Sequence, residues 1–271
     1  MSGSRSFFVS DVEVVARGLP EAIAEGLSAC FGSCRRAPLP ARTRVVFEVE
    51  RRGDGFRVMR DGEFVAGAPG ESTLLPALER ALYDAFPAWH PPPRAILHAA
   101  GVSLGERVLV FAGSSGAGKT AFARAFLELG AGYLGDETIF TDGERLWGFP
   151  RALQFDVLPE GAPPPPWLGE VDLRSYRFES DAGISVRPLL PPPEEAIRPG
   201  PHPASSARVI LLERGERDTV EPASAIDALR VLTTEAFGRV ETNLGPLLRA
   251  PLRVRWNDPR AAAERLLRHL P

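Results

Sequence analysis

Lysine is almost absent from this chain of 271 residues, in which Lys119 is the single lysine and every other strongly basic side chain is arginine. Cysteine is nearly as rare, with only Cys30 and Cys34, and four histidines are scattered along the chain. Two cysteines cannot build a disulfide framework, and no nearby residues complete a zinc site. We therefore expect two core or surface thiols and no metal centre of the cysteine and histidine type.

Strong net charge and long apolar runs are also missing. A net charge of -3 and a pI near 5.9 create no field that attracts nucleic acid or an anionic membrane. Apolar runs such as 108–112 and 209–212 are far shorter than the roughly 20 residues that span a bilayer. The N-terminus does not resemble a signal peptide. With 44% hydrophobic and 25% charged residues, the composition favours a cytoplasmic globular enzyme.

The rare lysine lies in a phosphate-binding pattern. Residues 113–120 read GSSGAGKT and match G-x-x-x-x-G-K-[ST]. In such a loop, backbone N–H groups cradle phosphates, the lysine reaches the β- and γ-phosphates, and the threonine hydroxyl holds Mg²⁺. We expect the nucleotide to be bound by Gly113, Ser114, Ser115, Gly116, Ala117, Gly118, Lys119, Thr120 and Ala121, and ATP and Mg²⁺ to be the cofactors.

The surroundings of this loop have the order that the pattern requires. Aliphatic runs at 96–104 and 107–112 predict two strands that meet at Gly105-Glu106. A helix follows at 120–129, and Gly130 is placed to end it. The next strand is expected at 133–140, and Asp142-Gly143 turns it into a strand at 145–149. These signals predict an α/β domain with a mixed sheet.

Two acids follow the loop at a distance that suits catalysis. Asp136 and Glu137 lie on the strand expected at 133–140, beside the loop. Because neighbouring strand residues point to opposite faces, one acid is expected to face the phosphates and the other to face elsewhere. One can serve Mg²⁺ with Thr120, and the other can accept a proton from an acceptor hydroxyl. The alternative is a charged pair at a strand end that faces solvent.

The rest of the chain suggests two domains. Residues 1–92 predict a small α+β domain, with helices at 19–30 and from Ser72 or Thr73, a strand at 44–50, and a hairpin closed by Asp61-Gly62. Prolines 91–93 mark the expected border, and residues 93–271 form the second domain. Proline-rich stretches at 163–166 and 187–203 are either lids or spacers. A strand at 207–212, a helix at 224–237, a strand at 252–256 and a helix capped by Asp258 complete the prediction.

With His98 on the strand before the loop, these residues resemble a known family. His98, the 113–120 loop and the acidic pair are similar to the catalytic domain of HPr kinase/phosphorylase, a bacterial protein-serine kinase, over about residues 95–271. They resemble more closely its relatives, some of which phosphorylate the C-terminal serine of lasso-peptide precursors. The resemblance implies a P-loop fold of the HPr kinase/PEP carboxykinase-like type. It also implies catalytic roles for Lys119, Asp136, Glu137, His98 and Arg151.

The chain departs from the family pattern at two positions. Glu137 stands where the family has a second aspartate, so the base and the metal ligand are not assigned between Asp136 and Glu137. The family's Glu-Ile-Arg-Gly stretch reads Phe-Pro-Arg-Ala at 149–152, which retains Arg151 as a phosphate clamp and favours an acceptor other than HPr. The alternatives are a satisfied core histidine for His98 and a surface arginine for Arg151.

The leading hypothesis is a Mg-ATP-dependent kinase that phosphorylates a serine or threonine hydroxyl of a peptide or protein. One alternative is a kinase of a small hydroxylated metabolite, and another is a nucleotide-binding regulatory ATPase without transfer activity. No nucleic-acid or membrane partner is expected, and a homo-oligomer is possible. A GTPase of the Ras type is excluded because its base-reading motif needs a second lysine.

Overall fold

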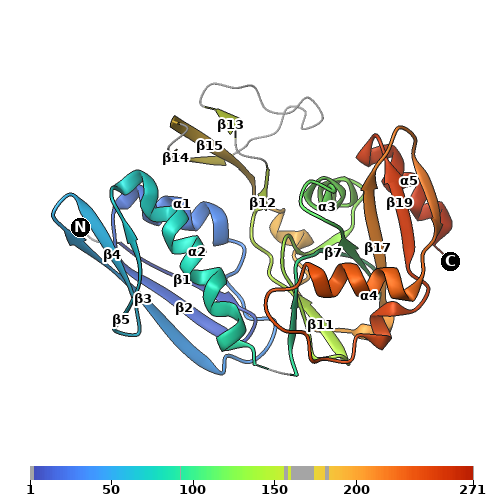
Figure 1. Cartoon of the computed structure of the whole chain (residues 1–271), viewed down its shortest axis with the longest axis horizontal. Coiled ribbons are helices and arrows are strands. Elements are labelled where there is room, and N and C mark those ends of the chain that lie inside the picture. The colour runs from blue at the N-terminus through green and yellow to red at the C-terminus, as the bar shows by residue number, and fades with distance from the viewer. Residues whose placement is uncertain (1–2, 92, 156–157, 160–173, 181–182, 271) are drawn as a thin grey trace. The chain divides into compact units, whose positions relative to one another are not determined.

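The computed structural model describes residues 3–91, 93–155, 158–159, 174–180 and 183–270 (Figure 1). The chain folds into two compact units. Unit 1 consists of residues 1–86 and 151–191, and unit 2 consists of residues 87–150 and 192–271. Both contain helices and sheets, so the expectation of an α/β protein with mixed sheets is confirmed. Within the described ranges, no helix is both long and apolar enough to cross a lipid bilayer.

Unit 1 is built on a five-stranded sheet in the order β1-β2-β3-β4-β5, in which only the β2–β3 pair is parallel. The hairpin between β4 and β5 turns at Asp61 and Gly62, both with positive φ, as predicted. A smaller sheet is added by the segment that follows residue 150. The elements are β1 (Gly3–Val9), β2 (Val12–Leu19), α1 (Glu21–Phe31), β3 (Thr43–Arg52), β4 (Gly55–Arg60), β5 (Glu63–Ala68), α2 (Glu71–Trp89), β12 (Leu153–Gln154), β13 (Leu158–Pro159), β14 (Arg174–Ser180) and β15 (Gly183–Leu190).

Unit 2 contains a six-stranded mixed sheet in the order β18-β19-β17-β8-β7-β9 and a four-stranded antiparallel sheet in the order β16-β11-β10-β6. Its elements are β6 (Ala95–Leu97), β7 (Ala100–Leu104), β8 (Arg107–Ala112), α3 (Lys119–Glu128), β9 (Gly132–Gly135), β10 (Ile139–Thr141), β11 (Arg145–Gly148), η2 (Glu194–Ala196), β16 (His202–Pro203), η3 (Ala204–Ser206), β17 (Ala207–Arg214), β18 (Thr219–Pro222), α4 (Ala225–Thr234), η4 (Gly245–Leu248), β19 (Leu252–Trp256) and α5 (Pro259–His269).

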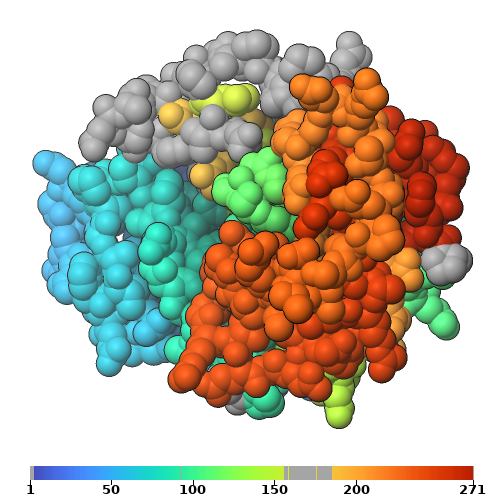
Figure 2. Space-filling view, turned by 45° about the vertical axis from the view of Figure 1, so that its right-hand side comes forward, coloured from blue at the N-terminus to red at the C-terminus, as the bar shows by residue number. Residues whose placement is uncertain are grey.

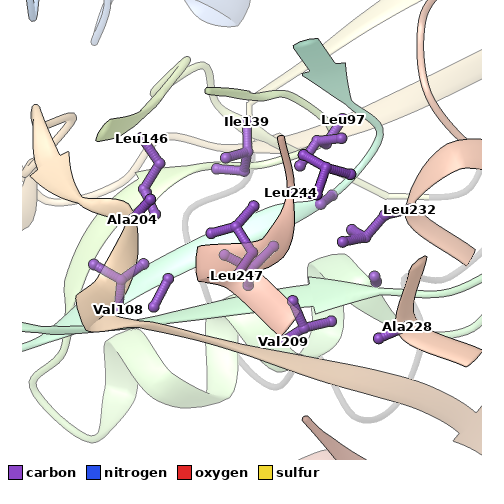
Figure 3. Packing of buried hydrophobic residues seen from close by; sticks show 14 of the residues in the cluster. Leu97, Val108, Ile139, Leu146, Ala204, Val209, Ala228, Leu232, Leu244 and Leu247 are labelled. Atoms are coloured by element: carbon purple, nitrogen blue, oxygen red, sulfur yellow. The ribbon is translucent and has the colours of Figure 1, made fainter. Parts of the chain in front are cut away.

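The central strand β8 is buried on both faces because its apolar residues alternate between two layers. Val108 and Val110 belong to a cluster that also contains Val209 of β17 and Leu232 of α4 (Figure 3). Phe111 faces the other way, where its ring lies 5.6 Å from that of Phe122 and 5.4 Å from that of Phe126, both in α3. Helix α5 packs against α3 on this second face. The apolar run that starts at Val108 therefore fixes the strand that leads into the loop.

The border between the units differs from the sequence prediction. The first border lies between Phe86 and Pro87, inside α2, rather than at prolines 91–93. Residues 151–191 were expected in the second domain, but they belong to unit 1. The reason is local: Ala152 N–H donates to Cys30 O at 2.8 Å, and β12 to β15 form their own sheet. The proline run 163–166 lies outside the described residues.

Two predicted strands are each broken in the structure. The run 96–104 splits at His98 because β6 belongs to the four-stranded sheet and β7 to the six-stranded sheet. The run 133–140 splits after Gly135, since Glu137 has a φ of 69° and ends the extended conformation. Helix α2 begins at Glu71, before the expected caps Ser72 and Thr73. The two breaks occur at His98 and Glu137, which are both predicted catalytic residues.

Candidate functional site

The loop 113–118 connects β8 to α3 in unit 2 and has the strand-loop-helix form expected from its pattern. Gly118 is the N-cap of α3, has a φ of 98°, and provides no side chain to bond the first helical N–H groups. The first N–H groups of a helix have no partner within the helix and carry its positive dipole end. Ser114, Ser115 and Gly116 of the loop are exposed, and green atoms from the middle of the chain reach the surface beside orange atoms of later residues (Figure 2). This geometry suits an anion such as a phosphate.

The side chain of Lys119 folds back over the loop. Its Nζ donates to Gly113 O at 2.9 Å and to Ser114 O at 3.3 Å, and the residue is 7% exposed. Burial lowers the pKa of Lys119, while the carboxylates of Asp136, Glu235 and Glu137 act in the opposite direction. The ammonium is thus bound by two backbone carbonyls and influenced by the charge of three carboxylates, in the place from which a P-loop lysine reaches phosphates.

Thr120 and Asp136 lie together, as the sequence predicts for a magnesium site. The Thr120 hydroxyl donates to Asp136 Oδ2 at 2.9 Å, and Asp136 is 1% exposed. The bond links the first turn of α3 to the end of β9. It contradicts the alternative of a solvent-facing acidic pair for Asp136. A hydroxyl and a carboxylate are hard oxygen donors of the type that Mg²⁺ prefers, so these residues fit the ion.

Glu137 lies next to Asp136 but in a different backbone conformation. With its left-handed φ of 69°, it does not simply alternate with Asp136 as a strand residue does, which corrects the expected continuous strand. Glu137 is half-buried and raises the pKa of both His98 and Lys119 by its charge. A non-glycine residue in this conformation costs about 1–2 kcal/mol, and such strain is common at functional sites. The two acids therefore differ in burial and in backbone conformation: Asp136 is buried, whereas Glu137 is half-buried and left-handed.

His98 joins the same cluster and brings one residue that the sequence does not indicate. Its Nδ1 lies 3.7 Å from Glu235 Oε2, and its ring centroid lies 5.6 Å from that of Phe237. The antiparallel bridge between Leu97 and Ala236 sets this register, which places His98 opposite Glu235. Burial and the Lys119 ammonium lower the pKa of His98, against the effect of Glu137 and Glu235. His98 is therefore neutral near neutral pH.

Glu235 follows α4, more than 90 residues after Asp136, and no local pattern marks it. The signal for it exists only in the fold, where β6 pairs with the end of α4. Its carboxylate raises the pKa of both His98 and Lys119. The cluster in unit 2 therefore consists of Lys119, Thr120, Asp136, Glu137, His98 and Glu235.

Arg151, a further predicted site residue, lies in unit 1, whereas the cluster described above lies in unit 2. It is 1% exposed, and donates from Nη2 to Glu79 Oε1 at 2.8 Å and from Nη1 to Tyr83 Oη. Its guanidinium carbon also lies 5.2 Å from the ring centroid of Phe31. The alternative of a surface arginine is thus wrong. These contacts account for the burial of Arg151 without a phosphate, and its role as a clamp stays a prediction.

The cysteines behave as expected from their number. Cys30 and Cys34 are free, buried thiols, and burial raises the pKa of both above the ordinary range. Among the described residues, no group of three or more histidine, cysteine, aspartate or glutamate side chains is arranged to hold a metal ion. An ion at Thr120 and Asp136 would complete its shell with phosphate oxygens and water, as Mg²⁺ commonly does.

Comparison with known proteins gives little beyond this geometry. No model of a protein family matches the chain, and no curated protein matches it. Among solved structures, the chain is similar to the HPr(Ser) kinase/phosphatase from Coxiella burnetii. The identity is 12%, the match covers 64% of this chain and 89% of that chain, and the TM-score is 0.30. A TM-score at that level assigns neither fold nor function, so the functional case rests on the residues of the site.

Proposed function

We propose that this protein is a kinase that transfers the γ-phosphoryl group of Mg-ATP to an alcohol, most simply a serine or threonine hydroxyl of a peptide or protein. The observation that carries the proposal is the 2.9 Å hydrogen bond from Thr120 to the buried carboxylate of Asp136, beside Lys119 in the phosphate loop. The fold would then be of the HPr kinase/PEP carboxykinase-like P-loop type that the sequence resembles. Glu137 and His98 border the same place and favour transfer over simple nucleotide binding.

We assign the roles of metal ligand and base to Asp136 and Glu137 from the contacts and conformation of each residue. Asp136 shares a hydrogen bond with Thr120, so we place it on the metal side. Thr120 and Asp136 would hold Mg²⁺, which would supply neutralisation of the charge that develops on the phosphates during transfer. Glu137 has a left-handed backbone conformation, is half-buried, and lies close enough to His98 and Lys119 to raise the pKa of both, so we assign it as the base that accepts the acceptor's proton.

In the transfer, the acceptor oxygen forms a bond to the γ-phosphorus while the bond from that phosphorus to the β–γ bridging oxygen breaks. ADP leaves with the electron pair of the broken bond, and the proton of the acceptor passes to Glu137. Lys119 balances charge on the β- and γ-phosphates after exchanging the carbonyls of Gly113 and Ser114 for phosphate oxygens. Neutral His98 contributes shape and hydrogen bonding rather than charge near neutral pH.

The test uses Asp136→Asn and Glu137→Gln in the full chain. We expect Asp136→Asn to weaken the magnesium-dependent part of ATP binding, measured by calorimetry with and without Mg²⁺. Glu137→Gln should leave ATP binding nearly unchanged and lower the rate of transfer by about 100-fold or more. Asp142→Asn is the matched control, because it removes one carboxylate from the same sheet region and should change neither quantity.

Labelled ATP offered with a peptide pool and, separately, with a pool of hydroxylated metabolites distinguishes the two kinds of kinase. Product in the peptide pool supports the proposal, and product only among the metabolites favours the small-molecule alternative. Hydrolysis without any labelled acceptor would favour a regulatory ATPase. If well-folded protein binds no purine triphosphate in the presence of Mg²⁺, the proposal is wrong.

A further inference from the structure

A second feature of unit 2 lies at the same edge of the sheet as the phosphate loop. Strands β8, β17 and β19 run parallel, so their carboxyl ends share one edge. The loop leaves the end of β8, Arg214 ends β17, and Trp256 ends β19. Ligands of open α/β sheets bind outside the carboxyl ends of the strands. Arg214 and Trp256 therefore lie on the side where a nucleotide held by the loop would extend.

Trp256 is fixed against the loop itself. Its Nε1–H donates to Ala117 O at 2.8 Å, and the residue is 1% exposed. A Cβ added to Gly118 would approach Trp256 Cζ2 to 2.0 Å, so the ring lies directly on the loop backbone. The Phe122 ring also packs edge-on against the Trp256 ring, with the two ring centroids 5.6 Å apart. The ring is thus a rigid support whose position follows that of the phosphate loop.

The guanidinium of Arg214 lies over this support. Its guanidinium carbon is 3.7 Å from the centroid of the Trp256 ring, and the residue is exposed. Its neighbours Arg253 and Arg255 form ion pairs with Glu213, Asp227 and Glu221. In the part of the chain that the structure describes, Arg214 forms no such pair. One face of its guanidinium covers the indole, and the exposed residue has solvent on its other side.

We propose that Arg214, stacked on Trp256, is the platform for the purine base of the nucleotide. This inference rests on the proposed function, since it needs a nucleotide whose phosphates lie on the loop. A guanidinium is planar, delocalised and weakly hydrated, and it stacks on aromatic rings, a role that lysine cannot take. A base stacked on the outer face of the Arg214 guanidinium would form the next layer above the loop, the Trp256 ring and Arg214. Stacking reads the flat surface of the base, so it favours purines over pyrimidines.

The experiment compares two ligands that share phosphates and differ in the base. ATP and inorganic tripolyphosphate are titrated by calorimetry with Mg²⁺ into the wild-type chain and into Arg214→Ala, Arg214→Lys and Arg217→Ala. We expect Arg214→Ala to weaken ATP binding about tenfold and to leave tripolyphosphate binding unchanged. Arg214→Lys, which keeps the charge and loses the plane, should behave like Arg214→Ala. Arg217→Ala removes an exposed arginine from the same turn and should bind both ligands like the wild type.

Equal weakening of both ligands in Arg214→Ala, with rescue in Arg214→Lys, would show a charge effect on phosphate and overturn the inference. Unchanged ATP binding in Arg214→Ala would also overturn it while leaving the proposed function intact. Failure of the wild-type chain to bind either ligand is the distinct result that removes the proposed function, and the base platform with it. Weaker binding of CTP than of ATP to the wild type, with the difference lost in Arg214→Ala, supports the stacking role.

Discussion

At the scale of single residues, two glycines of the loop show how a neighbouring side chain changes the loss of stability caused by a substitution to alanine. Gly116 has a φ of 78° and no atom within 4 Å of an added Cβ, whereas Gly118 has a φ of 98° and faces Trp256 at 2.0 Å. We expect Gly116→Ala to lower the free energy of unfolding by about 1–2 kcal/mol through backbone strain alone. Gly118→Ala should lower it by about 2–4 kcal/mol, because overpacking adds to the strain.

Urea denaturation of the two variants measures the difference, and tryptophan fluorescence in the folded state reports any shift of the Trp256 ring. Equal losses in the two variants would contradict the close packing of Trp256 on the loop backbone.

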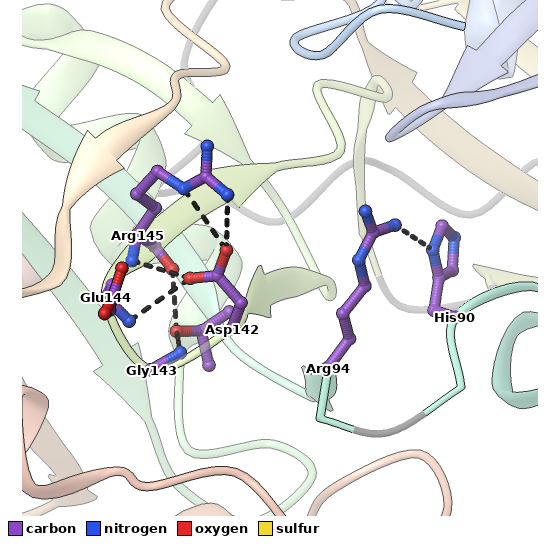
Figure 4. A network of polar contacts seen from close by, with 7 residues as sticks. His90, Arg94, Asp142, Gly143, Glu144 and Arg145 are labelled. Carbon is purple, nitrogen blue, oxygen red and sulfur yellow. Dashed lines mark hydrogen bonds and ion pairs between the residues drawn. The ribbon is translucent and has the colours of Figure 1, made fainter. Parts of the chain in front are cut away.

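Asp142 supplies a residue-scale prediction about pH. Although burial raises its pKa, hydrogen bonds from the backbone and side chain of Arg145 and from the Glu144 N–H lower it below 3.8 (Figure 4). The carboxylate therefore stabilises the fold above this pH, and the stabilisation is lost as the pH falls through the depressed pKa. We expect Asp142→Ala to cost about 1–2 kcal/mol at about pH 7 and less at about pH 3, where part of the charge-dependent stabilisation has been lost.

Urea denaturation at both pH values tests this expectation. Glu144→Ala removes the same charge from the same turn and should cost little at either pH. A loss in Asp142→Ala that does not depend on pH would show that its carboxylate charge is not responsible.

At the scale of elements, helix α5 begins in the way its sequence predicts. Asp258 Oδ1 accepts the Ala261 N–H at 2.7 Å, and Pro259 occupies the first turn. We expect Asp258→Ala to lower the free energy of unfolding by about 1 kcal/mol, because the first turn loses its cap. Asp258→Asn keeps a capping oxygen and should retain most of the stability. Thermal unfolding followed by circular dichroism compares them, and equal losses would argue against a capping role.

Elements with local signals were predictable, and those defined by distant partners were not. The Asp61-Gly62 hairpin, the cap of α5, and Gly130, with a φ of 84° after α3, follow from short-range chemistry. The breaks at His98 and Glu137 were missed because an apolar run looks the same whether it stays in one sheet or crosses between two. Strands β12 to β15 pair with one another, and no strand was predicted in this stretch of the chain.

The candidate site likewise contains residues that a local pattern predicts and residues that only the fold brings in. The loop and Asp136 carry a pattern with fixed spacing, and the structure brings Thr120 and Asp136 together as that pattern requires. Glu235, Arg214 and Trp256 reach the loop only through strand pairing across about 100 residues or more, which no local pattern encodes. Arg151 also carries a motif; its contacts with Glu79 and Tyr83 of α2 could not be predicted from that motif, and its role at a phosphate stays a prediction.

At the scale of the whole molecule, unit 1 is made from two separate stretches of chain. Removal of residues 1–86 would take Glu79 and Tyr83 away from Arg151, so the buried ion pair between Arg151 and Glu79 would be lost. Loss of one partner of a buried ion pair costs about 3–5 kcal/mol. We therefore expect a fragment of residues 93–271, which follows the sequence-based border, to be prone to proteolysis within 151–191.

Limited proteolysis with mass spectrometry tests the fragment against the full chain. Arg151→Met in the same fragment, which removes the charge that Glu79 no longer pairs, is the matched control and should reduce the cleavage. A fragment as resistant as the full chain would contradict the dependence of residues 151–191 on the N-terminal stretch.

Because unit 1 is built from two separate stretches of chain, its parts are synthesised at different times. Its first 86 residues emerge early, but β12 to β15 emerge only after residues 87–150 have been synthesised. At about 5–20 residues per second, the nascent N-terminal stretch waits about 5–20 s for its remaining strands. During that interval Glu79 lacks Arg151, and α1 lacks the strand β14 that contacts it in the finished unit. Unit 1 is therefore completed only when more than two thirds of the polypeptide has been made.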